Sequence, residues 1–231
     1  MITVIIPTLN SEKDLAHTLA ALVPAAAEGV VKEVVIVDGG SADHTDQVAD
    51  AAGCEWLAIP ASRGERMTAG VNQSRRGEWL LFLSADSVLE SGWHHEAQSF
   101  IERAERSGSG DRSAAAFMLR YDAFGLGPRV SEAFAMIRSR LLGMPYGNQG
   151  LLISRRFYSR IGGHRPLPEM EDLDLVKRIG ARRLHSLRSA AISSGRQERD
   201  QGMVTNARRA LARFVAGTFR LPTKLVLKLH G

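Results

Sequence analysis

Short apolar runs alternate with amphipathic stretches over the first 90 residues of the chain. The runs ITVIIPT, KEVVIVDGG, EWLAIP and EWLLFLSADS are rich in Val, Ile and Leu and end in small or polar residues. After the first run, Leu15, Leu19 and Leu22 recur at helical spacing, with Asn10 or Ser11 as a candidate N-cap. Strands that alternate with helices are typical of βαβ units. The pattern therefore predicts an α/β fold with a mostly parallel sheet and helices on both faces.

Further elements follow from the same periodicities. Helices are expected over residues 41–53 (capped by Ser41), 63–77, 91–105, 128–143 and 169–180, a strand over 114–122, and a glycine-rich turn, a strand and a short helix within 146–163. The Gly/Ser-rich segment 106–113 predicts a disordered loop. Residues 203–230 interleave Arg and Lys with Ala, Leu, Val and Phe, as in a basic amphipathic helix broken near Pro222. We therefore expect one domain over residues 1–200 and a C-terminal basic amphipathic helical tail over residues 201–231.

Composition narrows the class of protein. The chain has 231 residues, of which 44% are hydrophobic and 24% charged, which suits one α/β domain or one domain plus a tail. Cys54 is the single cysteine, so the sequence excludes a disulfide framework and a cysteine-based zinc site and fits a reducing compartment. The N-terminus has no basic start, and no apolar run reaches the about 18 residues of a membrane span. These features predict a cytoplasmic protein.

Charge is unevenly placed along the chain. Residues 182–231 hold 11 of the 30 Lys and Arg and two of the 25 acids, so this C-terminal part has a net charge of +9 and residues 1–181 have a net charge of −4. Such a tail predicts contact with an anionic partner: phospholipid headgroups, a phosphate-bearing substrate or nucleic acid. A solvated basic helix is the alternative. Nucleic acid is disfavoured because the sequence has no aromatic stacking platform and no recognised nucleic-acid-binding module.

Three of the predicted strands end in polar residues that are suited to bind a ligand. These ends are Pro7-Thr8-Leu9-Asn10, Asp38-Gly39-Gly40-Ser41 and Ser84-Ala85-Asp86-Ser87. In an open parallel sheet, ligands bind at the carboxyl ends of the strands. An acid there can accept from a ribose hydroxyl or a base N–H, and glycines beside it let a flat ligand approach the backbone. Asp-Gly-Gly is also an ordinary turn, but the three ends together indicate a nucleotide site.

These segments, with others, resemble the motifs of a known family. VIIPTLNSE, VIVDGGSADHT, RGERMTAG, LLFLSADS, GNQGLLISRR and MEDLDLVKRI look like the successive motifs of the family 2 glycosyltransferases. The resemblance runs from residue 2 to about residue 196. It implies the GT-A fold, with a Rossmann-like sheet, and transfer of a sugar from a nucleotide diphosphate sugar. More narrowly, the chain is similar to the small bacterial radical-SAM/selenodomain-associated glycosyltransferases.

The resemblance also implies which residues meet the donor. The implied nucleotide-sugar-binding residues are Pro7, Thr8, Asn10, Asp38, Gly39, Gly40, Arg63, Asp86 and Gln149. Two of these have ordinary alternatives, because Arg63 can be a surface residue at a helix start and Gln149 can belong to a plain turn.

A metal ligand is implied as well. Family members carry Asp-x-Asp after the fourth strand, and its last acid helps to hold a divalent cation on the diphosphate. Here Ser84 takes the place of the first acid and Asp86 that of the second. Mg²⁺ or Mn²⁺ would neutralise the leaving diphosphate and can bind through few carboxylates. The missing acid leaves three alternatives open: full metal binding, looser metal binding, or a catalytically impaired protein that binds a nucleotide sugar.

Catalysis is implied at a third motif. Met170-Glu171-Asp172 resembles the Glu-Asp motif that supplies the general base of inverting members. Asp172 is the expected base, with Glu171 as a supporting carboxylate or the alternative base. Acids in the first turn of a helix also favour the helix dipole, which is the structural alternative. The acceptor is unidentified and is either soluble or lipid-linked; with a lipid-linked acceptor, the basic tail would hold the protein on the inner face of the membrane.

The positions of the histidines do not favour a metal site. His94 and His95 are adjacent in a predicted helix, where neighbouring side chains are expected to point apart. The remaining histidines show no metal-ligand spacing. The sequence therefore predicts no histidine metal site.

Overall fold

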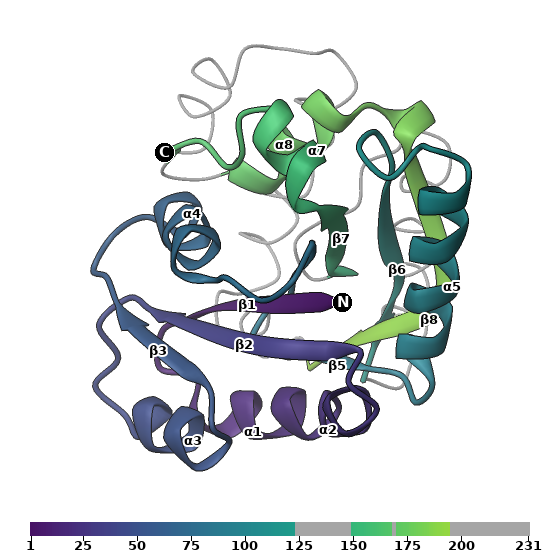
Figure 1. Ribbon diagram of the computed structural model, residues 1–231. Helices are drawn as coiled ribbons and strands as arrows, with labels where there is room; N and C mark the ends of the chain where they lie inside the picture. Colours follow the sequence, from purple (N-terminus) through teal and green to yellow (C-terminus); the bar gives the residue numbers. More distant parts are fainter. Residues whose placement is uncertain (123–148, 168–169, 195–231) are drawn as a thin grey trace.

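The computed structural model describes residues 1–122, 149–167 and 170–194 (Figure 1). The elements, in chain order, are β1 (Ile2–Thr8), α1 (Glu12–Ala20), α2 (Val23–Ala27), β2 (Val31–Asp38), α3 (Thr45–Ala51), β3 (Glu55–Ala58), α4 (Arg63–Gln73), β4 (Trp79–Phe82), β5 (Ser87–Leu89), α5 (Trp93–Arg106), β6 (Ala114–Tyr121), β7 (Leu151–Ser154), α7 (Arg155–Arg160), α8 (Glu171–Ile179), a 3-10 turn (Ala181–Arg183) and β8 (Leu184–Ser193). The expected helix over residues 128–143 and the tail over residues 201–231 lie outside these ranges.

One sheet holds all the strands of the described ranges, in the order β3-β2-β1-β4-β7-β6-β8-β5. Strands β3, β2, β1 and β4 run parallel to one another. Beyond β4 the sheet becomes mixed: β7 is antiparallel to both β4 and β6, β8 is parallel to β6, and β5 is antiparallel to β8. The α/β class is confirmed, and the strictly parallel part consists of β1 to β4, residues 2–82.

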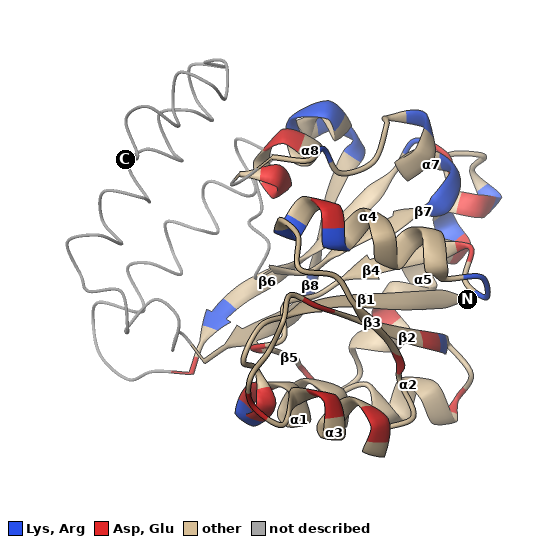
Figure 2. Cartoon of the chain, turned by 90° about the vertical axis from the view of Figure 1, so that its left-hand side faces the viewer, with Lys and Arg blue, Asp and Glu red and all other residues tan. Residues whose placement is uncertain are grey.

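The helices cover both faces of the sheet, as expected. Successive residues of a strand point to opposite faces, so Val4 and Ile6 of β1 belong to one apolar cluster and Ile5 to the other. The first cluster also contains residues of α1, α3 and α5. The second contains residues of α4, α7 and α8. In Figure 2, α1 and α3 lie below the sheet, and α4 and α7 lie above it.

Several local expectations are wrong. Helix α3 begins at Thr45 and not at Ser41, because the Ser41 hydroxyl donates to Asp38 instead of capping a helix. The segment 106–113 is a hydrogen-bonded turn, in which the Ser109 amide donates to the Ala104 carbonyl at 2.8 Å. Strands β5 and β8 were not predicted, because β5 has only three residues and β8 contains Arg, His and Ser among its apolar residues.

None of the helices within the described ranges has both the length and the apolar character needed to cross a bilayer.

Candidate functional site

The predicted strand ends lie along one edge of the sheet. Thr8 at the end of β1 is in register with Asp38 at the end of β2. β4 pairs with β1 only as far as Ile5, so Pro7, which has no N–H, lies beyond the last residue pair with β4. The chain leaves β4 after Phe82 and passes through the turn that carries Ser84 and Asp86 before it enters β5.

Asp38 is buried and saturated with hydrogen bonds. One carboxylate oxygen accepts from the Thr8 hydroxyl at 2.8 Å and the Ser41 hydroxyl at 2.5 Å, and the other accepts from the Gly40 and Ser41 amides at 2.8 and 2.7 Å. Burial alone would raise the pKa of Asp38, but the hydrogen bonds from Ser41, Thr8 and Gly40 outweigh it and hold the pKa below its usual value. Asp38 thus fixes the turn after β2. A direct contact with a ribose would have to replace one of these bonds.

Asn10 and Arg66 connect this turn to its neighbours. The backbone of Asn10 is in the left-handed region at φ 51°. Its side-chain oxygen accepts a hydrogen bond from the Ala42 amide at 2.8 Å, and its backbone amide donates to the Ser41 hydroxyl at 2.8 Å. Arg66 of α4 donates to the Thr8 carbonyl and lies against Gly39, where a Cβ would meet its guanidinium nitrogen at 2.7 Å. Glycine at position 39 therefore leaves room for the Arg66 guanidinium to lie on the turn. Nothing in the sequence singled out Arg66, except its place one turn after Arg63.

Arg63 brings together the motifs that the sequence assigned to donor and base. Its Nη1 lies 2.6 Å from Glu171 Oε1 and 2.6 Å from Asp172 Oδ2, and its Nη2 lies 3.5 Å from Ser84 Oγ. Figure 2 shows basic and acidic positions on the adjoining α4 and α8. Gly64 permits this approach, because a Cβ there would overlap the carbonyl of Arg165 and meet Glu171 Cβ at 3.3 Å.

The two carboxylates of this cluster differ in burial. The side chain of Glu171 is 7% exposed and that of Asp172 25% exposed. Burial raises the pKa of Glu171, and the charge of Asp172 raises it further, while Arg63 opposes both effects. The residue before them, Met170, is in the left-handed region at φ 64° although it is not a glycine. Such strained backbone is concentrated at functional sites.

His164 is a site residue that sequence reasoning missed. It is buried, and its Nε2 lies 4.0 Å from Asp172 Oδ1. Burial lowers its pKa to about 4, so the ring is neutral at pH 7. The Tyr158 hydroxyl accepts from the His164 amide at 2.9 Å and lies 3.0 Å from Nδ1. If that hydroxyl donates to Nδ1, the ring proton is on Nε2 and faces Asp172. The sequence feature that could have pointed to His164 is its place six residues before the Met-Glu-Asp motif.

Asp86 is buried behind the Ser84 turn. Its Oδ2 accepts from the Ser193 hydroxyl at 3.0 Å, and burial raises the pKa of Asp86 more than this bond lowers it. Within the described ranges, no group of three acidic or histidine ligands includes Asp86. One carboxylate with the Ser193 hydroxyl bonded to it is a sparse donor set. It fits a cation that takes most of its ligands from phosphates and water.

Gln149 is 1% exposed, and its amide nitrogen donates to the Phe117 carbonyl of β6 at 3.1 Å. This bond ties the start of β7 to β6. Contact of Gln149 with the donor sugar or the acceptor, as the resemblance implies, would use the amide oxygen or the second N–H of this buried side chain. It stays a prediction.

Comparison with known proteins yields sequence relatives. Residues 3–146 match the family profile described as Glycosyl transferase family 2. A "PGL/p-HBAD biosynthesis glycosyltransferase" of Mycobacterium bovis is 32% identical in an alignment of 120 positions that covers 46% of this chain and 44% of that protein. A relative of the same description in Mycobacterium tuberculosis matches equally well. The matched part of the chain spans 44% of the length of these curated relatives.

Two solved structures have a similar arrangement of elements. Staphylococcus aureus TarS 1–349 has a TM-score of 0.66 at 16% identity, over 99% of this chain and 69% of that one. Glucosyl-3-phosphoglycerate synthase of Mycobacterium tuberculosis, crystallised with Mn²⁺, uridine-diphosphate-glucose and phosphoglyceric acid, has a TM-score of 0.62 at 19% identity, over 94% and 79%. At these identities the likeness concerns the fold, which is the GT-A fold.

Proposed function

Because the chain belongs to glycosyl transferase family 2, we propose that this glycosyltransferase moves a sugar from a nucleotide diphosphate sugar to an acceptor hydroxyl, with inversion at the anomeric carbon. The observation that carries the proposal is the position of Arg63, 2.6 Å from both Glu171 and Asp172 and beside Ser84. It unites the strand-end turn, which suits a diphosphate, with a carboxylate pair that suits a base.

The donor would lie over the turns at the ends of β1 and β2. Asp38 shapes the second turn, where Arg66 covers Gly39 and nothing lies within 4 Å of the Cβ position of Gly40, so the backbone at Gly40 is open to a flat ligand. Arg63 and Arg66 supply positive charge for the diphosphate. The structural neighbour crystallised with uridine-diphosphate-glucose supports a donor of this class. Asp86 would hold a divalent cation, Mg²⁺ or Mn²⁺, whose charge would stabilise the diphosphate as it leaves.

Asp172 is our choice of base because its carboxylate is more exposed than that of Glu171. It would take the proton of the acceptor hydroxyl as that oxygen attacks the anomeric carbon and the diphosphate departs with the bonding electrons. Arg63 is bound to this carboxylate in the structure. A diphosphate competes for the same guanidinium, so donor binding would free Asp172 for proton transfer.

The acceptor is open between a soluble and a lipid-linked molecule. We favour a lipid-linked acceptor because the sequence of residues 203–230 interleaves basic and apolar positions, as in helices that lie in a membrane interface. This segment lies outside the described ranges, so the argument rests on its sequence alone. It implies a peripheral position on the inner face of the membrane.

Release of nucleoside diphosphate from a panel of sugar donors, with and without Mn²⁺, tests the proposal. We expect release from at least one donor when acceptor extracts are present, and more release with Mn²⁺. A chain that binds a nucleotide diphosphate in calorimetry but releases none from any donor would instead be a catalytically impaired binding protein. Ser84, in the place of an acid, is the observation that favours this second function.

A further inference from the structure

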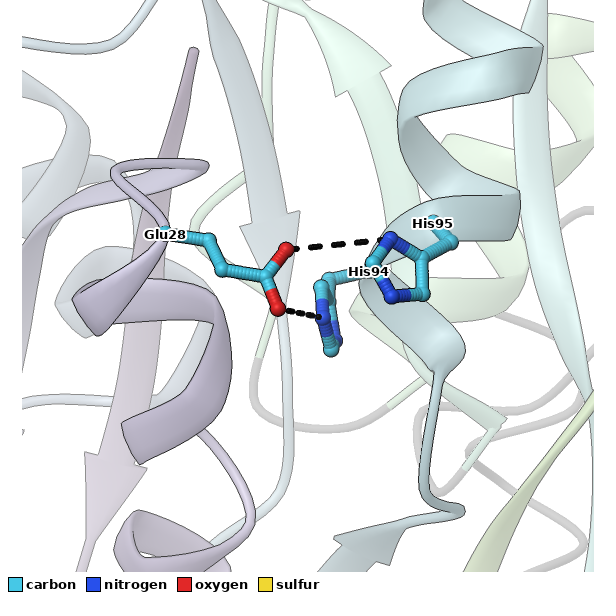
Figure 3. A group of neighbouring side chains, drawn as sticks. All are labelled: Glu28, His94 and His95. Atoms are coloured by element: carbon cyan, nitrogen blue, oxygen red, sulfur yellow. Dashed lines mark hydrogen bonds and ion pairs between the residues drawn. The ribbon is translucent and has the colours of Figure 1, made fainter.

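A second group of chemically reactive side chains lies away from the proposed donor site. Glu28 follows α2, and His94 and His95 lie in the first turn of α5; Figure 3 shows the three side chains converging. The expectation that the two histidines point apart is wrong, because their ring centroids are 4.2 Å apart. Both side chains lean toward the N-terminal end of α5, where no preceding turn separates them.

The spacing of the ligand atoms suits a small metal ion. His94 Nε2 lies 3.2 Å from one oxygen of Glu28, and His95 Nδ1 lies 3.7 Å from the other. One ligand atom from each residue lies within 4.8 Å of the other two. In tetrahedral coordination with zinc bonds of 2.0–2.1 Å, ligand atoms are about 3.3 Å apart. The spacing of 3.2 Å between His94 Nε2 and Glu28 Oε1 is therefore already close to that around a coordinated ion, and the other spacings would have to shorten.

We propose that Glu28, His94 and His95 bind Zn²⁺ or a similar transition metal, with water in the fourth position. Two imidazoles and one carboxylate are a known zinc ligand set, and imidazole nitrogen disfavours Mg²⁺. His94 is the fixed ligand, since its side chain is 5% exposed. The side chains of His95 and Glu28 are 67% and 48% exposed, so small rotations close the remaining distance.

The surroundings of the three side chains determine how a metal ion reaches the proposed site and how tightly it binds. His95 borders an open pocket of about 710 Å³, which gives the ion a path from solvent. His94 Nδ1 is buried and has no hydrogen-bond partner in the described ranges. Coordination through Nε2 places the ring proton on this Nδ1, and an unsatisfied buried donor weakens binding by about tenfold or more. We therefore expect a dissociation constant on the order of micromolar rather than the tighter values of four-ligand structural sites.

The proposed ion is distinct from a cation on the donor diphosphate. Glu28 precedes β2, whereas Asp38 ends it, and the strand from Val31 to Asp38 is about 23 Å long at about 3.3 Å per residue. The ion would join the end of α2 to the start of α5. It would thus act as a structural clip between two helices rather than at the reacting sugar.

Calorimetric titration of the metal-stripped full chain with Zn²⁺, without nucleotide, tests the proposal. We expect one Zn²⁺ per chain and no binding of Mg²⁺. His95→Ala should lower the affinity by more than about tenfold, and Glu28→Gln should also weaken binding, because each removes or weakens a ligand. The exposed His44, which lies before α3, provides a matched control, so His44→Ala should bind as the wild type does.

Three further readouts make the outcome decisive. Zinc should raise the melting temperature of the wild type but not of His95→Ala, and the two proteins should melt alike without zinc. Asp86→Ala should retain the site, which separates it from the proposed donor cation. Absence of zinc binding in the wild type, or wild-type affinity in His95→Ala, would overturn the proposal and leave the proposed transferase function untouched.

Discussion

Arg63 is the residue whose replacement tests the arrangement of the proposed active site most directly. Arg63→Met keeps much of the apolar stem and removes the charge that Glu171 and Asp172 share. Loss of one partner from a fully buried ion pair costs about 3–5 kcal/mol. The side chains of Arg63 and Asp172 are 27% and 25% exposed, so solvent offsets part of this cost. We expect the free energy of unfolding to fall by about 2 kcal/mol at pH 8.

The pH dependence distinguishes lost charge from lost packing. The pKa of Glu171 is already raised by burial and by Asp172, and it rises further when Arg63 is absent. A carboxyl whose pKa is higher in the folded chain than in the unfolded chain favours folding at low pH, and this contribution is lost as pH rises through the folded pKa. The destabilisation in Arg63→Met should therefore be smaller at pH 5 than at pH 8, as measured by urea unfolding.

A matched control exists on the same side of the molecule. Arg165 pairs with Asp174 at 3.3 Å, but its side chain is 58% exposed. Arg165→Met should change the free energy of unfolding by less than about 0.5–1 kcal/mol at either pH. An equal loss at pH 5 and pH 8 in Arg63→Met would mean that packing of the arginine stem, and not its charge, holds the site together.

Three further predictions address the base, the cation and the tail. Asp172→Asn should keep donor binding but lose about 10²–10⁴-fold in transfer rate, because an amide cannot take the proton; a wild-type rate would move the role to Glu171 or dismiss it. Asp86→Ala should weaken Mn²⁺-dependent binding of nucleoside diphosphate in calorimetry and leave the circular dichroism unchanged; unchanged affinity would contradict the metal role. The full chain should sediment with anionic vesicles at low salt and dissociate as salt rises, since each Lys or Arg near the surface contributes about 1 kcal/mol; a chain ending near Gly202 should stay in the supernatant, and a full chain that does so too would contradict membrane binding.

The part of the fold from β1 to β4 could be predicted from the sequence because its elements follow local sequence patterns. Strands β1, β2 and β4 are buried on both faces, so their sequences are nearly continuous apolar runs. The turns after them carry polar residues where a parallel sheet opens. The second half departs from this rule. Strand β8 mixes buried, half-buried and exposed positions without regular alternation, and its partners β5 and β6 are distant in sequence, so no local pattern predicts it.

The proposed site was readable only in part, for a related reason. Motifs located Arg63, Asp86 and Asp172, but the bond between Arg63 and Asp172 joins residues 109 positions apart, and Asp86 is bonded to Ser193, 107 positions away. His164 escaped notice because its meaning depends on burial beside Tyr158 and on its approach to Asp172. Position in sequence gives neither. The same holds for the convergence of Glu28 with the histidines of α5, which depends on how two helices meet.

The neighbours of Ser84 give a physical reason for a serine in the place of the first acid of the family's Asp-x-Asp motif. Arg63 Nη2 is 3.5 Å from Ser84 Oγ, and this guanidinium already contacts two carboxylates. An acid at position 84 would place a third carboxylate on one cation and add repulsion where a diphosphate is proposed to enter. With a hydroxyl there, the positive charge of Arg63 and Arg66 is less fully offset, so the arginines can share the neutralisation of the diphosphate with a cation held by Asp86. On this argument transfer should fall but persist when Mn²⁺ is chelated, and Arg63→Met should make what remains dependent on the metal.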